Sequence, residues 1–147
     1  MIEGHVRRDG AWIVQGEVFI PQLGVSGLPV TFLMDPTQER TLLLPRAWTR
    51  VPNLRALPDI PAEDRLTALG GELRGWKIQA LVRLSDEIHM YVYQTPIVAL
   101  TESRSTENEL SRLGRDILNQ CILESDPSEG SLLLQPRTWD FQVAREP

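Results

Sequence analysis

Residues 76–92 read WKIQALVRLSDEIHMYV and carry the clearest structural pattern in the chain. Apolar side chains recur at alternate positions, with Lys77 and Gln79 among the polar residues between them. The apolar positions are Trp76, Ile78, Ala80, Val82 and Leu84, followed by Ile88, Met90 and Val92. A period of two is typical of a half-buried β-strand. The polar break at residues 85–87 therefore predicts a long β-hairpin.

Shorter apolar segments on either side of this hairpin predict an all-β chain. The expected strands are residues 12–20, 30–34, 41–44, 96–100, 122–124 and 131–134, with a further strand within 138–143. Glycines and prolines separate these segments, and the eleven prolines of the chain disfavour long helices. We expect residues 51–62 and 101–111 to be irregular, because the first segment holds three prolines and the second is polar.

One segment near the C-terminus has the period of a helix instead. Leu113, Ile117 and Cys121 follow one another at spacings of four, which places them on one helical face. We predict a short amphipathic helix over residues 115–120. Cys121 then lies on an apolar face, where we expect a small buried hydrophobe rather than a nucleophile.

The composition of the 147 residues is that of a globular protein with one domain, whose core we expect over about residues 12–136. The net charge of −5 argues against a nucleic-acid surface, which requires clustered lysine and arginine. One cysteine and two histidines supply few metal ligands, so we expect no metal site and no cofactor. No apolar run reaches the roughly 20 residues of a membrane span, and the N-terminal residues lack the apolar core of a signal peptide. We therefore expect a cytoplasmic protein without a membrane partner.

Two segments together resemble the retropepsin family of aspartic peptidases. Residues 29–35 are an apolar run that ends in Asp35 and is followed by Thr41 and Leu42. The family has an apolar strand that ends in Asp-Thr-Gly-Ala, followed by a threonine–hydrophobic step. Residues 113–119, LGRDILN, resemble the family's hydrophobic-Gly-Arg-Asp/Asn helix, which packs behind the active-site loop. The helix motif is the more specific of the two, because an aspartate after an apolar strand is common at turns.

The resemblance implies a closed β-barrel with a flap hairpin and one short C-terminal helix. It assigns one catalytic aspartate, Asp35, to each chain, so a working site requires a homodimer. In the family two such carboxylates share a proton, and one acts as a base toward water while the other acts as an acid toward the scissile carbonyl. Gly70 and Gly71 resemble the glycines of the family's flap, with a plain turn between strands as the alternative.

The helix motif supplies Gly114, Arg115 and Asp116 as supports of the site and of the dimer. The resemblance implies that Arg115 reaches toward the partner's site loop and that Asp116 pairs with a nearby arginine. A capped helix with exposed charges is the alternative. The N-terminal residues and the segment 138–143 are candidates for the interface, because the termini of retropepsins interleave into a shared sheet.

Three consecutive residues, Pro36, Thr37 and Gln38, depart from the family's active-site loop. Pro36 replaces a threonine whose hydroxyl and N–H bond across the dimer axis, and proline supplies neither donor. Thr37 replaces a glycine, and its β-branched side chain either points into the space of the substrate or changes the path of the loop. Gln38 replaces a small alanine. Thr37 keeps its N–H, which can still bond to the Asp35 carboxylate.

Three functions remain open on these residues. The first, which we favour, is a homodimer that binds a peptide or protein segment in its cleft but has impaired or absent peptidase activity. The second is an active aspartic endopeptidase that uses the Asp35 pair and an activated water. The third is an unrelated β-barrel interaction domain in which residues 35–37 form an ordinary turn, since aspartate before proline commonly opens turns.

Overall fold

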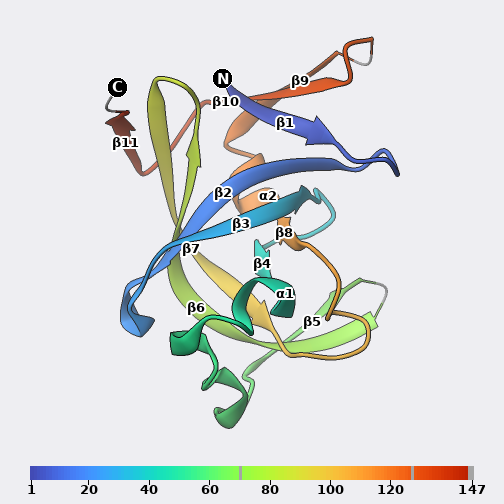
Figure 1. Ribbon diagram of the computed structural model, residues 1–147, viewed down its shortest axis with the longest axis vertical. Helices are drawn as coiled ribbons and strands as arrows, with labels where there is room; N and C mark the ends of the chain where they lie inside the picture. Colours follow the sequence, from blue (N-terminus) through green and yellow to red (C-terminus); the bar gives the residue numbers. More distant parts are fainter. Residues whose placement is uncertain (70, 127, 146–147) are drawn as a thin grey trace.

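The computed structural model describes residues 1–69, 71–126 and 128–145, which form mostly β-structure (Figure 1). The strands are β1 (Ile2–Val6), β2 (Trp12–Ile20), β3 (Val25–Met34), β4 (Leu42–Leu43), β5 (Asp64–Ala68), β6 (Gly71–Ser85), β7 (His89–Leu100), β8 (Ser111–Leu113), β9 (Cys121–Asp126), β10 (Ser131–Pro136) and β11 (Phe141–Ala144). The helical segments are α1 (Pro45–Trp48), α2 (Arg115–Leu118), η1 (Pro21–Leu23), η2 (Pro52–Leu54) and η3 (Leu57–Asp59). The predicted all-β class is confirmed.

Strand pairing joins the described strands into one eleven-stranded sheet. From β2 the path of paired strands runs through β3, β8, β4 and β7 to β6. Strand β6 then pairs with β2 through contacts such as Val18 opposite Val82, so the path returns to its start and forms a ring. Strands β1, β10 and β9 extend the sheet from β2, and β5 extends it from β6. Figure 1 shows this extension at the upper right and the β5–β6 hairpin at the lower right.

The predicted hairpin is confirmed and is longer than the sequence pattern alone indicates. Strands β6 and β7 pair from Gly75 opposite Leu100 to Ser85 opposite Met90. Residues 96–100 therefore belong to β7 rather than to a separate strand. A Cβ atom at Gly75 would lie 2.6 Å from the Ala99 carbonyl oxygen, so this position requires glycine because the partner strand approaches so closely.

The turn of this hairpin is held by the Asp86 carboxylate. Its Oδ1 accepts the backbone N–H groups of Ile88 at 2.8 Å and His89 at 2.6 Å. Burial alone would raise the pKa of Asp86, but these N–H donors hold that pKa below its ordinary value. The polar break in the sequence is therefore a structured turn built around a carboxylate.

Two apolar clusters lie on opposite faces of the ring strands, because neighbouring side chains on a strand point to opposite faces. The larger cluster fills the interior and includes Phe32, Leu43, Ala99 and Leu113. The second cluster consists of Leu42, Leu44, Val98 and Leu100, and Leu69 and Leu73 of the β5–β6 hairpin pack against it. The face that carries the second cluster is called the site face below.

The structure differs from the sequence predictions where elements are short. Strands β1 and β5 were not predicted, and β8 begins at Ser111, within the segment expected to be irregular. The segment 51–62 is anchored by the buried Leu54 and Leu57, and its Ile60 carbonyl accepts the indole N–H of Trp76 at 2.9 Å. Within the described residues, no helix has the length and hydropathy needed to cross a membrane.

Candidate functional site

Asp35 comes directly after β3, at the point where β3 runs parallel to β8. Met34 lies opposite Leu113, and the Asp35 N–H donates to the Leu113 carbonyl at 3.0 Å. Met34 and Leu113 face the interior, so the alternation along β3 turns Leu33 and Asp35 toward the site face. The predicted catalytic residue is half-buried there, at the start of the segment 35–40, which we call the site loop.

The first four residues of the site loop form a tight turn. The Gln38 N–H donates to the Asp35 carbonyl at 3.1 Å, with Pro36 at the second position of the turn. The Thr37 N–H donates to Asp35 Oδ1 at 3.0 Å, and the Thr37 hydroxyl donates to the same oxygen. The expectation that the Thr37 N–H bonds to the carboxylate is confirmed. The Thr37 side chain folds back onto Asp35.

Asp116 ties the helix α2 to two distant segments. Its carboxylate accepts the Thr41 N–H at 3.0 Å, the Thr41 hydroxyl at 2.8 Å and the Thr95 hydroxyl at 3.1 Å. A fourth donor is the Ile117 N–H at 3.0 Å. The expectation that Asp116 pairs with an arginine is wrong for the described residues, because threonine hydroxyls and N–H groups occupy its oxygens. Asp116 therefore fixes the end of the site loop against α2 and β7.

Gly114 allows α2 to approach the site loop from behind. A Cβ atom at this position would lie 2.5 Å from the carbonyl carbon of Arg40, so any side chain would require backbone movement. The Arg115 N–H donates to the Gln38 carbonyl at 2.8 Å, and the Asp116 N–H donates to the Glu39 carbonyl at 3.2 Å. The helix start thus binds the loop backbone directly. The Arg115 side chain is exposed in the single chain, and its reach toward a partner remains a prediction.

The comparisons with known proteins concern the fold. No family model and no curated protein matches the chain. Among solved structures, the crystal structure of a retropepsin-like aspartic protease from Rickettsia conorii is similar, with a TM-score of 0.55 and 14% sequence identity. The match covers 98% of this chain and 92% of that chain. The fold is retropepsin-like.

The β5–β6 hairpin contains Gly71, one of the two glycines that the sequence analysis assigned to a flap. Gly71 begins β6 opposite Ala68, and Gly70 lies outside the described residues. Leu69 next to the tip has a φ of 51°, a left-handed conformation that is uncommon for leucine, and yet its side chain packs on the site face. Gly71 has open space around its Cβ position, so neither packing nor backbone conformation explains a glycine there.

Arg112 of β8 is a site residue that the sequence reasoning missed. It lies opposite Leu33 in β3 and Leu42 in β4, so its side chain shares the site face with Asp35. Arg112 is only 8% exposed, and its Nη2 donates to Glu109 Oε2 at 2.7 Å. The only signal in the sequence was an arginine between Ser111 and Leu113, a pattern that is equally common in an exposed strand.

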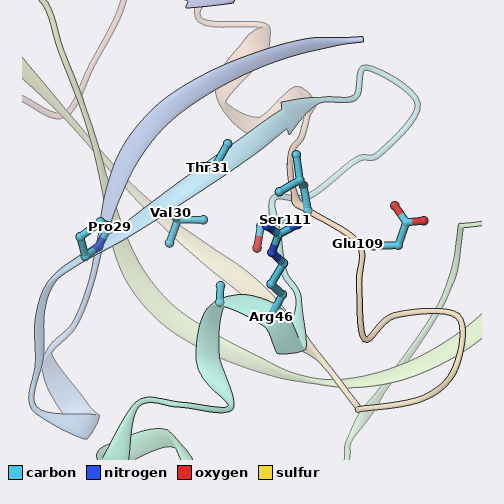
Figure 2. A pocket seen from close by; sticks show the side chains of 8 residues that line it. Pro29, Val30, Thr31, Arg46, Glu109 and Ser111 are labelled. Carbon is cyan, nitrogen blue, oxygen red and sulfur yellow. The ribbon is translucent and has the colours of Figure 1, made fainter. Parts of the chain in front are cut away.

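A small pocket lies between β3, α1 and the segment that enters β8 (Figure 2). Its lining residues are Pro29, Val30, Thr31, Arg46, Ala47, Glu109, Leu110 and Ser111. Its volume of about 180 Å³ is below the roughly 300 Å³ at which ligand pockets usually begin, and Asp35 does not line it. This pocket is therefore too small to be a peptide cleft on its own.

Cys121 has no features of a nucleophile. Burial raises the pKa of its thiol, an effect that the hydrogen bond with the Tyr93 hydroxyl only partly opposes. The thiol is half-buried against the interior cluster, in agreement with its predicted role as a small apolar residue. The aspartate, and not the cysteine, is the candidate for chemistry.

Proposed function

We propose that the protein is a homodimer of retropepsin-like chains that binds a peptide segment over a pair of Asp35 residues and has little or no peptidase activity. The observation that carries the proposal is the position of Asp35, half-buried on the site face at the end of β3. The start of α2 holds the loop from behind, and the β5–β6 hairpin covers the same face. A peptide segment between hairpin and loop would contact both.

The details of the site loop support impaired chemistry. Thr37 donates twice to Asp35 Oδ1, so one carboxylate oxygen already serves the local turn rather than a water. Pro36 is exposed and has neither a hydroxyl nor an N–H, so it cannot donate a hydrogen bond to a second loop. The two loops of a dimer would therefore be held together less firmly than in relatives that have threonine at this position.

The open edge of β9 supports self-association. Strand β9 ends the strand order, pairs with β10 and exposes Ile122 and Leu123 by 39% and 46%. An unpaired apolar edge is a template for pairing with another chain. The helix α2, whose start contacts the site loop, directly precedes β9 in the chain. The terminal strand β11, which was expected at the interface, pairs with β7 of the same chain.

A peptide-library cleavage assay from acidic to neutral pH tests the proposed activity. We expect no cleavage, or only slow cleavage, by the wild type, and faster cleavage by the double variant Pro36→Thr/Thr37→Gly. The double variant restores the donors of the cross-axis bonds and frees Asp35 Oδ1 from the hydroxyl. Efficient wild-type cleavage that is lost in Asp35→Asn would overturn the impaired state and establish the active endopeptidase.

Light scattering after size exclusion tests the dimer. We expect a dimer for the wild type and a monomer for Leu123→Lys, because a lysine on the β9 edge repels its copy across the interface. Ile88→Lys is the matched control, since it places a lysine at another exposed apolar site, 66% exposed in the β6–β7 turn. A wild type that is monomeric at every concentration would contradict the proposal.

A further inference from the structure

Arg112 is buried on the face where a substrate would lie. Its neighbours at the same level of the sheet are Leu33 and Leu42, and Leu33 is two residues before Asp35. The second apolar cluster, which includes Leu42 and Leu44, continues along the same face. A buried arginine among leucines is unusual, because a buried charge is costly unless it is fully paired.

The guanidinium of Arg112 is only partly paired. Its Nη2 donates to Glu109 Oε2 at 2.7 Å, whereas its Nε is buried and has no hydrogen-bond partner among the residues that the structure describes. Arginine binds a carboxylate best through two parallel N–H bonds, and a buried donor without a partner is rare. One of the two N–H donors that could bind a carboxylate in parallel is therefore buried and unpaired.

Glu109 would compete only weakly with a ligand carboxylate for the Arg112 guanidinium. Its side chain is 45% exposed, against 10% for Arg112, and it belongs to the segment that connects β7 to β8. An exposed carboxylate can exchange its single bond for water at little cost. Arg83 also has an unpaired Nε, but its guanidinium lies over the Phe19 ring at 5.0 Å and its side chain is 26% exposed. Arg112 has the deeper burial of the two.

Resting on the proposed function, we infer that Arg112 selects peptides with an acidic side chain, whose carboxylate takes both N–H donors of the fork in place of Glu109. The leucines around Arg112 exclude water and thereby strengthen the ion pair. The net charge of −5 repels acidic peptides at long range, so this selection is local and depends on the peptide's position in the cleft. Arg112 is a specificity determinant and takes no part in bond cleavage.

Peptide binding tests this assignment independently of cleavage. The probes are pairs of fluorescein-labelled peptides that differ only by glutamate or glutamine at one position, which is moved along the peptide from pair to pair. Fluorescence anisotropy gives the Kd of each peptide for the wild type and for Arg112→Gln, Arg112→Lys and Glu109→Gln. Thermal melts of the same samples verify that each variant is folded, and Glu109→Gln leaves Arg112 itself intact.

At one position we expect the glutamate peptide to bind the wild type about tenfold more tightly than its glutamine twin. This ratio should fall to about one in Arg112→Gln, stay intermediate in Arg112→Lys, which keeps the charge without the fork, and rise in Glu109→Gln. If the glutamate and glutamine peptides bind equally well at every position, or if their Kd ratio persists in Arg112→Gln, the role of Arg112 is overturned. The proposed function would then still stand. A wild type that binds none of the peptides would overturn the proposed function, and the inference would fall with it.

Discussion

Asp35 and Asp116 lie on either side of the same loop but are held in different ways. The Asp116 carboxylate accepts four hydrogen bonds, from Thr41, Thr95 and its own helix. The Asp35 carboxylate accepts bonds from Thr37 in its own turn, both on Oδ1. The difference separates a carboxylate that joins distant segments from one whose hydrogen bonds, among the described residues, stay within its own turn. It predicts that Asp116 contributes mainly to stability and that Asp35 contributes mainly to function.

Replacement of Asp116 should have the largest effect on stability. Asp116→Ala leaves the Thr41 and Thr95 donors without their acceptor, and we expect a loss of about 3 kcal/mol in the free energy of unfolding. Urea denaturation measures this loss. Asp126→Ala is the matched control, because Asp126 bonds within its own exposed turn to Ser128 and Glu129, so its loss should destabilise the protein much less than the loss of Asp116. Equal losses of stability for the two variants would contradict the role of Asp116 in fixing the site loop against α2 and β7.

Gly114→Ala tests the close approach of α2 to the loop that Asp116 secures. The added Cβ would lie 2.5 Å from the Arg40 carbonyl carbon, and we expect a loss of about 2 kcal/mol. Gly71→Ala provides the comparison, since nothing lies within 4 Å of its Cβ position and we expect a change near zero. Thermal unfolding of both variants distinguishes them. A Gly114→Ala variant as stable as the wild type would mean that the helix does not fix the site loop.

Asp86 resembles Asp35 in accepting bonds from its own turn, but its side chain is only 8% exposed and its pKa is lowered. A carboxylate whose pKa is lower in the folded state stabilises the protein above its unfolded-state pKa. That contribution is lost as the pH falls through the folded-state pKa. We expect Asp86→Asn to cost about 1 kcal/mol at neutral pH and progressively less toward acid pH. Urea titrations of both proteins at several pH values measure the difference in the free energy of unfolding. A difference that grows toward acid pH would contradict the prediction.

Asp35→Asn should have the smallest effect on stability. The asparagine side-chain oxygen can still accept the Thr37 N–H, so we expect a change below about 0.5 kcal/mol. Any peptide cleavage by the wild type or by Pro36→Thr/Thr37→Gly should nevertheless disappear. Urea denaturation and the cleavage assay together check both parts. A loss as large as that of Asp116→Ala would make Asp35 a structural residue and remove the contrast between the two carboxylates.

The sequence predicts those parts of the fold whose signal is local. The alternation over residues 76–92 reflects pairing between adjacent strands, and the hairpin β6–β7 follows from it. Strand β8 holds three residues, too few for a period, and pairs in parallel with the distant strand β3. Its existence depends on contacts that no local pattern contains.

The residues of the candidate site also fall into two groups, those with a local sequence signal and those without one. Asp35 and residues 114–116 could be predicted because they form contiguous motifs, and the Thr37 N–H bond follows from turn geometry. The partners of Asp116 could not, since Thr41 is 75 residues away in the sequence. The burial of Arg112 likewise arises only when β3, β4 and β8 assemble around it.

The meeting of two Asp35 residues across a dimer axis is tested most directly by disulfide trapping. Asp35→Cys in a Cys121→Ser background places one thiol at each site loop, and Gln142→Cys in the same background places it on the exposed strand β11. After mild oxidation, mass spectrometry measures the fraction of covalent dimer. We predict nearly complete trapping through residue 35 and little through residue 142. Failure of the residue 35 variant to exceed the residue 142 control would contradict the paired site.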